Sequence, residues 1–209
     1  LTGKYRPGLS REGKIGNVPV YRLGLGFSFD KFFLPIFAFL KFLSLRKKLS
    51  QPILFWAMMV SYSSIAAFFL KYFFPKIPLL LTIQEGDSEE HIHRARFGLV
   101  GFFWRLLVRR ADKIQVISNY LADLARSFGA KTLIEVVPNG VDLEKFSNPD
   151  LKKTLILSRK LGIKPNEKII ITTSRLTHKN AVDIIIRAMS LIKTEARLLI
   201  LGSGEEKTR

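Results

Sequence analysis

Short apolar runs and segments with helix-spaced apolar positions alternate from residue 78 to residue 201. The short runs predict buried strands, and the segments between them predict helices, because their apolar positions recur every three to four residues. Alternation of strand and helix is typical of an α/β fold with parallel sheets. The predicted strands are 78–83, 113–117, 133–137, 168–173 and 197–201, and the predicted helices are 97–110, 120–128, 151–161 and 181–193.

Residues 49–70 form an uncharged stretch of 22 positions, which is long enough to raise the question of a membrane-spanning helix. Pro52 lies near its start, the serine-rich segment 61–64 lies in its middle, and lysines flank both ends without asymmetry. These features argue against a span. We therefore expect a short strand over 53–56 and a packed helix that ends near Tyr72, with a membrane anchor as the alternative.

The chain of 209 residues contains 34 Lys plus Arg and 17 Asp plus Glu, which gives a net charge of +17. Hydrophobic residues make up 47%, a share that is typical of a globular protein and excludes a disordered chain. The absence of cysteine excludes a disulfide framework, a thiolate zinc site, an iron–sulfur cluster and a cysteine nucleophile. Charge is concentrated at the two ends: residues 1–82 hold 12 basic and 2 acidic residues, and residues 151–209 hold 13 and 5.

The first 82 residues combine basic and apolar side chains, and no acidic residue occurs between Asp30 and Glu85. Lipid headgroups attract Lys and Arg, and aromatic side chains favour the membrane interface, so the pattern favours peripheral contact with an anionic membrane surface. Nucleic-acid binding also needs a basic face, but it uses aromatic side chains in a polar groove. A core helix with a lysine-rich outer side is the remaining alternative. The aromatic residues expected to be buried or lipid-facing are Phe32, Phe33, Phe37 and Phe39.

Two cations, Arg175 and Lys179, follow the predicted strand 168–173. Ligands bind parallel α/β sheets beyond the carboxyl ends of the strands, where helix N-termini present free amides. Arg can form a bidentate contact with a phosphate, and Lys can act as a point charge, so this loop fits a diphosphate. The alternative is that both side chains are merely solvated. Gly202-Ser203-Gly204 follows the next strand, where glycine lets backbone approach a ligand closely.

Three segments, taken together, resemble the family-4 glycosyltransferases. They are VVPNGVDLEKF at 136–146, SRL with Lys179 at 174–179, and LILGSG at 199–204. The resemblance is clearest over residues 114–204 and looser over residues 78–87. It implies the GT-B architecture, in which two Rossmann-like domains face a cleft and a sugar is transferred from a nucleotide-diphosphate donor with retention of anomeric configuration.

The resemblance also implies a division of the chain and of its binding residues. The Pro-Asn-Gly-Val-Asp segment marks the passage between domains, which gives an acceptor-side domain over residues 1–137 and the start of a nucleotide-sugar-binding domain over residues 138–209. Arg175 and Lys179 are expected to hold the donor diphosphate and to neutralise the charge that develops on it. The other donor-binding residues that the resemblance implies are Asn139, Gly140, Gly202, Ser203 and Gly204.

An acceptor site is implied at the end of the strand 78–83. Many relatives carry His at this place, where the present chain has Gln84 and Glu85, so these two residues and Ser118 are the acceptor-side candidates. Ser118 or Asn119 is also expected to cap the helix 120–128, because Ser and Asn are favoured at that position.

Three other kinds of site, namely a metal site, a glycosidase carboxylate pair and a Ser-His-Asp arrangement, have weaker support in the sequence. The residue types of a metal site occur in the acidic segment Glu89-Glu90-His91-Ile92-His93, but such an exposed loop is more often only a loop, and we expect no metal or cofactor. Glu85 and Asp87 are weak support for a glycosidase carboxylate pair, because they lie two residues apart in one loop. No Gly-x-Ser-x-Gly segment supports a Ser-His-Asp arrangement.

The chain begins with Leu1, and we expect it to be a fragment. By resemblance, a first strand with its glycine-rich turn would precede Leu1, and a pair of donor-binding Glu residues seven apart would follow Arg209. Residues 151–209 are 59 residues, fewer than the roughly 100 to 150 of a usual domain. We therefore expect an incomplete second domain and an isolated chain without activity.

The resemblance, together with the basic and aromatic first 82 residues, thus implies a retaining glycosyltransferase that acts on a lipid-linked, polysaccharide or other glycan acceptor at the cytoplasmic face of the cell membrane. The expected partners are a nucleotide sugar, that acceptor and an anionic membrane surface, and no nucleic acid. Two alternatives from other classes remain: a basic nucleic-acid-binding module, and an integral membrane protein anchored by residues 49–70.

Overall fold

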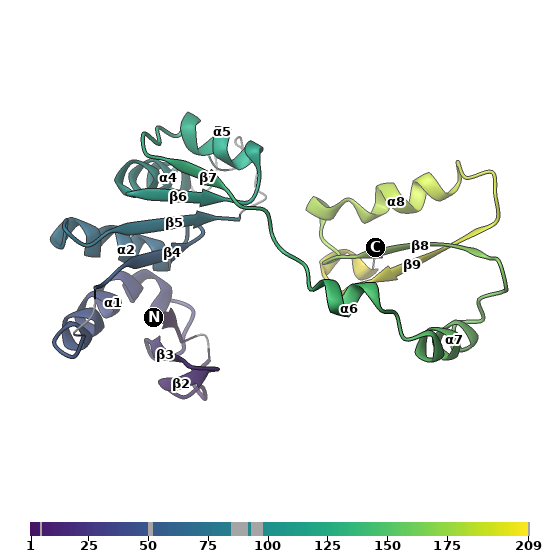
Figure 1. The fold of residues 1–209 in the computed structure, drawn as a ribbon, viewed down its shortest axis with the longest axis horizontal. Helices are drawn as coiled ribbons and strands as arrows, with labels where there is room; N and C mark the ends of the chain where they lie inside the picture. The colour runs from purple at the N-terminus through teal and green to yellow at the C-terminus, as the bar shows by residue number, and fades with distance from the viewer. Residues whose placement is uncertain (5, 50–51, 85–91, 93–97, 209) are drawn as a thin grey trace. The chain divides into compact units, whose positions relative to one another are not determined.

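The computed structural model describes residues 1–4, 6–49, 52–84, 92 and 98–208. The chain divides into two compact units, Leu1–Gly140 and Val141–Arg209 (Figure 1). This division falls three residues after the predicted boundary at residue 137. Both units combine helices with parallel strand pairing, so the predicted α/β fold is confirmed.

The first unit is built on a four-stranded parallel sheet of order β4-β5-β6-β7. Leu81 of β5 pairs with Ile114 of β6, which in turn pairs with Ile134 of β7. Because all four strands run in one direction, their carboxyl ends meet at one edge of the sheet. The strands are β4 (Phe55–Met58), β5 (Leu79–Ile83), β6 (Lys113–Val116) and β7 (Ile134–Val136).

One face of this sheet carries the hydrophobic core. Along β4, Phe55 and Ala57 are buried whereas Trp56 and Met58 are exposed, as the period of two in a strand requires. Helices α2 (Tyr62–Phe73), α4 (Leu99–Arg110) and α5 (Asn119–Ser127) pack on the buried face. Their contributions to the core include Ala67, Leu70, Trp104, Leu107, Val108, Leu121, Ala125 and Phe128.

The uncharged stretch 49–70 is divided between β4 and α2, as the sequence analysis expected. Ser61 and Ser64 begin α2 through a capping box, in which each side chain bonds the other residue's backbone. In the part of the chain that the structure describes, no helix has the length and apolar character needed to cross a membrane.

An ion pair lies at the amino-terminal edge of the sheet, opposite the edge where the carboxyl ends of the strands meet. The side chain of Lys71 is 7% exposed, and its ammonium group lies 2.8 Å from Asp112 and donates to the backbone carbonyls of Pro75 and Ile77. The Asp112 carboxylate also accepts a hydrogen bond of 2.6 Å from the Leu79 amide. Burial raises the pKa of Asp112, but the hydrogen bonds from Lys71 and Leu79 outweigh it and hold the pKa below its usual value.

The N-terminal segment forms a separate small sheet that the sequence analysis did not predict. β2 (Glu12–Ile15) pairs antiparallel with β3 (Val18–Leu23), and β1 (Thr2–Gly3) pairs parallel with the other side of β3. Helix α1 (Asp30–Arg46) follows and packs against α2 and β4 through Phe42, whose ring lies 5.1 Å from that of Phe55.

The second unit contains two parallel strands, β8 (Lys168–Thr173) and β9 (Ala196–Leu201), joined through α8 (Val182–Met189). The helix predicted over 181–193 ends four residues early, because the amides of Leu191 and Ile192 bond only three residues back. Two further helices, α6 (Leu143–Ser147) and α7 (Leu151–Lys160), begin at the capping side chains of Asp142 and Asp150.

Candidate functional site

The donor-side candidates lie in the loop between β8 and α8. Arg175 stands two residues beyond the end of β8, and Lys179 stands in the short helix η1 (His178–Asn180). Both side chains are exposed. The side-chain amide of Asn180 donates a hydrogen bond of 2.6 Å to the backbone carbonyl of Arg175, which fixes the loop between the two cations. The loop therefore presents both cations at the carboxyl end of β8, as predicted.

The glycine turn after β9 packs directly against this loop. The Ser174 amide bonds the Leu201 carbonyl at 3.1 Å, and the Leu176 amide bonds the Ser203 carbonyl at 2.9 Å. A Cβ atom on Gly202 would lie 1.9 Å from the Ser174 carbonyl oxygen, and one on Gly204 would lie 2.2 Å from that of Leu176. Glycine is thus required at both positions by contact between the two loops, and donor contact by Gly202, Ser203 and Gly204 stays a prediction.

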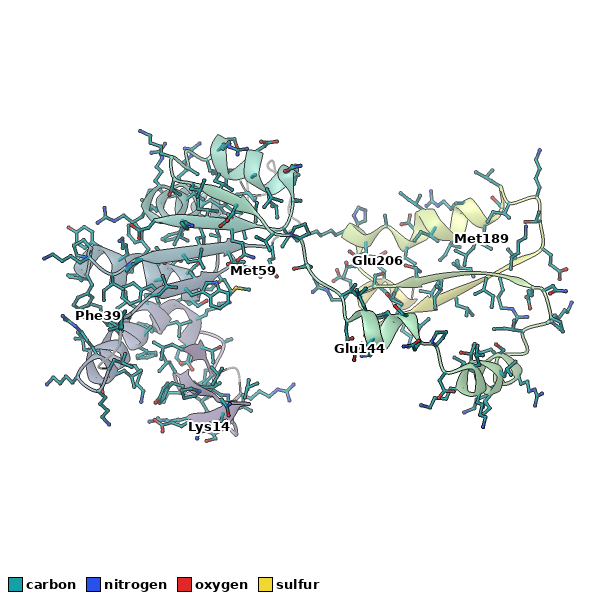
Figure 2. All side chains as sticks on the ribbon, viewed as in Figure 1. Lys14, Phe39, Met59, Glu144, Met189 and Glu206 are labelled. Atoms are coloured by element: carbon teal, nitrogen blue, oxygen red, sulfur yellow. The ribbon has the colours of Figure 1, made fainter. Side chains whose placement is uncertain are left out.

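A hollow of about 590 Å³ lies between η1, the start of α8 and the end of β9. Thr177 and His178 line it together with Asp183 and Arg187, whose side chains form an ion pair of 3.6 Å. Glu206 of the terminal helix η2 (Glu205–Thr208), labelled in Figure 2, also lines it. Arg175 and Lys179 are not among its lining residues, so the structure does not join the two predicted cations to this hollow.

The boundary residues Asn139 and Gly140 are exposed at the end of the first unit, after β7. A Cβ atom on Gly140 would meet no atom within 4 Å. Neither residue therefore has a packing reason comparable to that of Gly202, and their part in donor binding stays a prediction.

The acceptor-side candidates lie at the carboxyl edge of the sheet in the first unit. Gln84 directly follows β5, and Ser118 follows β6, whereas Glu85 lies outside the described residues. The Ser118 hydroxyl accepts a hydrogen bond of 3.3 Å from the Leu121 amide and so caps α5, as the sequence predicted. The residues considered for a metal site or a carboxylate pair, at 85–91 and at His93, also lie outside the described residues.

The same edge holds a polar cluster that the sequence analysis missed. After β4 the chain turns at Met59, which has a left-handed φ of 61° and is labelled in Figure 2, and then reaches Ser61 and Ser63, whose hydroxyl oxygens lie 2.7 Å apart. The signal was present as the serine-rich segment 61–64 directly after an apolar run, because Ser is favoured at the start of a helix. These serines line a hollow of about 390 Å³ together with Lys4 and Lys31.

Asp30 borders this hollow and organises the loop before α1. Its carboxylate accepts hydrogen bonds from three successive amides, those of Leu25, Gly26 and Phe27, at 2.5 to 3.0 Å. Burial raises the pKa of Asp30. The three amide donors and the charge of Lys4 lower it by more than burial raises it, so the pKa lies below its usual value. The hollow thus combines an ionised carboxylate with two lysines and two hydroxyls, a set suited to a polar ligand.

A comparison with protein families decides the classification. The sequence model described as Glycosyltransferase Family 4 matches residues 2–145, which is more than half of the chain and covers the first unit from its second residue onward. The chain belongs to glycosyltransferase family 4. The resemblance is therefore confirmed at the level of the family. The matched range includes the Pro-Asn-Gly-Val-Asp segment, whereas the β8–α8 and β9 loops lie beyond residue 145.

Curated relatives of this family-4 chain include enzymes named for glycolipids. It is 26% identical over 139 residues to the alpha-monoglucosyldiacylglycerol synthase of Streptococcus pneumoniae, with 62% of this chain and 31% of the relative covered. It is 31% identical over 104 residues to a GDP-mannose-dependent monoacylated alpha-(1-6)-phosphatidylinositol monomannoside mannosyltransferase of Corynebacterium glutamicum, with 48% and 27% covered.

A third relative is the D-inositol 3-phosphate glycosyltransferase of Xylanimonas cellulosilytica, which is 33% identical over 86 residues, with 39% of this chain and 21% of the relative covered. The chain thus aligns with about a fifth to a third of the length of these relatives.

Proposed function

We propose that this family-4 chain is part of a retaining glycosyltransferase that moves a sugar from a nucleotide-diphosphate donor to a lipid-linked, polysaccharide or other glycan acceptor. Family membership supports glycosyl transfer in general. The observation that carries the finer proposal is the exposed pair Arg175 and Lys179 on the loop at the carboxyl end of β8.

The chemical reason lies in the leaving group. Breaking a glycosyl–phosphate bond leaves a diphosphate with two to three negative charges, and fixed cations stabilise such charge best when they are already in place before the reaction. The guanidinium of Arg175 can contact two phosphate oxygens, and the ammonium of Lys179 can neutralise a third. The Asn180–Arg175 hydrogen bond and the packing of Gly202 and Gly204 hold the loop in place for this role.

A lipid-linked acceptor at the cytoplasmic membrane face is the second part of the proposal. Two of the relatives are named for diacylglycerol and phosphatidylinositol substrates, both of which are lipids. The hollow lined by Lys4, Lys31, Ser61 and Ser63 supports an acceptor with hydroxyl or phosphate groups, because its lysines and hydroxyls can bond both.

The test is sugar transfer by the full-length protein. Arg175→Ala and Lys179→Ala are each expected to lower kcat/KM for the nucleotide sugar at least tenfold, equivalent to about 1.4 kcal/mol, because each removes a cation from the developing diphosphate charge. Lys193→Ala removes an exposed lysine from the same unit and is expected to leave the kinetics unchanged.

Unchanged kinetics in both loop variants would remove the two cations from the mechanism. Salt-dependent binding to random oligonucleotides by the wild-type protein, without any response to nucleotide sugars, would instead support the nucleic-acid-binding alternative that the charge of +17 left open.

A further inference from the structure

Helix α1 is apolar on two opposite sides. Leu34, Ala38 and Phe42 face the interior and are buried. On the opposite side, five large apolar side chains fall within an arc of roughly 100° when 3.6 residues make one turn. These residues, called the α1 stripe below, are Phe32, Phe33, Ile36, Leu40 and Leu43, and they are 60%, 50%, 57%, 58% and 37% exposed.

The α1 stripe continues into an apolar groove formed by three helices. Phe32 and Ile36 from α1 line this groove with Ile65 and Phe69 from α2 and with Leu99 from α4, and its volume is about 480 Å³. Phe69 and Leu99 are themselves 42% and 56% exposed. Exposed apolar side chains that are scattered singly need no explanation, but a continuous patch over several helices marks an interaction surface.

Basic residues lie at both ends of the α1 stripe. At its start, the Lys31 ammonium lies over the rings of Phe32 and Tyr62, at 5.2 and 5.9 Å from the ring centres. At its end follow Arg46, Lys47 and Lys48, which are all exposed. Asp30, the first residue of α1, accepts hydrogen bonds from three amides of the preceding loop. The sequence holds no further acidic residue until Glu85, so α1 and α2 contain no other carboxylate to offset these charges.

An apolar stripe with basic residues at both ends favours some binding partners over others. A second copy of the chain would bring the same uncompensated cations against each other, which opposes self-association at this face. An anionic lipid surface offers hydrocarbon to the stripe and phosphates to the lysines at its ends.

We propose that the α1 stripe inserts into the interfacial zone of an anionic membrane, with α1 parallel to the membrane plane. Lys31, Arg46, Lys47 and Lys48 then contact lipid phosphates. A helix of 17 residues is about 25 Å long, which suits a helix that lies in the interface. The inference rests on the membrane location within the proposed function and names the surface responsible for it, but it requires no sugar transfer.

The test is co-sedimentation of the full-length protein with vesicles, without nucleotide sugar. We expect the wild type to bind vesicles of equal parts phosphatidylglycerol and phosphatidylcholine at low salt. The triple variant Phe33→Ser/Ile36→Ser/Leu40→Ser is expected to reduce the partition coefficient at least tenfold. These side chains are at least half exposed, so the variant is expected to keep its fold, which circular dichroism checks.

A matched control removes apolar side chains of similar exposure from the second unit. Leu151→Ser/Leu155→Ser/Ile156→Ser on α7 changes residues that are 71%, 60% and 65% exposed and is expected to leave vesicle binding unchanged. Lys47→Gln/Lys48→Gln is expected to weaken binding to the anionic vesicles severalfold, and its control Lys152→Gln/Lys160→Gln is expected to weaken it less.

Three results would overturn the inference: undiminished binding by the α1 triple variant, equal binding to pure phosphatidylcholine, or a wild-type dimer in analytical ultracentrifugation that the triple variant abolishes. The last result would make the stripe a contact between copies. Failure of the proposed function looks different, because vesicle binding would then persist while no sugar is transferred from any nucleotide sugar.

Discussion

At the scale of single residues, Lys71 carries a buried charge. Its side chain is 7% exposed, and its ammonium group contacts oxygen atoms of three residues, one of them Asp112. Asp112 also accepts a hydrogen bond from the Leu79 amide. The Lys71–Asp112 ion pair therefore connects the end of α2 to the start of β5. A buried charge with a complete set of partners costs much more to disrupt than an exposed ion pair.

Lys71→Met is therefore expected to destabilise the first unit by about 1–3 kcal/mol, because it leaves Asp112 and two carbonyl groups without their donor. Lys113→Met is the matched control. Lys113 lies 3.9 Å from Glu135 and both side chains are more than half exposed, so a loss of at most about 1 kcal/mol is expected. Urea unfolding followed by tryptophan fluorescence measures both, since Trp56 and Trp104 lie in the first unit. Equal losses in the two variants would contradict the prediction.

The pKa of Asp112 gives this pair a pH dependence with a definite sign. Its pKa in the folded unit lies below the unfolded value of about 3.9, so the ionised carboxylate favours the folded state. The contribution is complete above the unfolded pKa and disappears as the pH falls through the folded pKa. The difference in unfolding free energy between wild type and Lys71→Met is thus expected to be constant from pH 5 to 7 and to shrink below about pH 4. A difference that grows on acidification would show that another group dominates.

At the scale of elements, Ser118 links a helix cap to the carboxyl edge of the sheet in the first unit. Its hydroxyl accepts a hydrogen bond from the Leu121 amide at the start of α5. Ser118→Ala is therefore expected to lower the free energy of unfolding by about 0.5–2 kcal/mol. Ser118→Asn keeps a capping oxygen and is expected to retain nearly full stability. If Ser118 is an acceptor-side residue as predicted, the Asn variant raises the KM for the acceptor while its urea midpoint stays unchanged. An unchanged KM would confine Ser118 to its structural role.

The elements differ in how far the sequence could predict them. β5, β6, β7, β8 and β9 were predicted to within one residue at each end, because each is an apolar run between polar or glycine-containing turns. The small sheet β1-β3-β2 was missed, because every residue of β2 is exposed and its Glu-Gly-Lys-Ile sequence shows no apolar alternation. Its strands are specified by pairing with each other, and a single-sequence pattern does not report pairing.

The candidate site, like the small sheet, could be predicted from the sequence only in part. The position of Arg175 and Lys179 beyond β8 followed from the strand pattern alone. The need for Gly202 and Gly204 did not, because it arises from the carbonyl oxygens of Ser174 and Leu176, almost 30 residues earlier in the chain. Likewise, the serines after β4 join the carboxyl edge of the sheet only because β4 runs parallel to β5. Residues that follow one strand are predictable, whereas contacts between loops of different strands require the fold.

At the scale of the whole molecule, the two units differ in how much apolar surface they bury. The core of the first unit includes Leu79, Leu81, Ile83, Leu107 and Val116, all with no measurable exposure. In the second unit, none of residues 141–207 is buried, and Ile169, Ile171 and Ile184 are at least 41% exposed. Local opening costs least where few apolar contacts are buried, so the units are expected to differ in stability within one chain.

Hydrogen exchange of the 209-residue chain tests this difference. The amides of β5 and β6 lie in the centre of a four-stranded sheet beneath buried side chains, whereas those of β8 and β9 lie in a two-stranded sheet without a buried core. We expect exchange in β5 and β6 to be at least tenfold slower than in β8 and β9, equivalent to an opening free energy higher by about 1.4 kcal/mol. Equal protection in both sheets would mean that the second unit is stabilised by contacts other than apolar burial. Little buried apolar surface is present in the second unit to hold the loop that carries Arg175 and Lys179. The shape of this loop therefore depends on backbone hydrogen bonds and on the packing of Gly202 and Gly204.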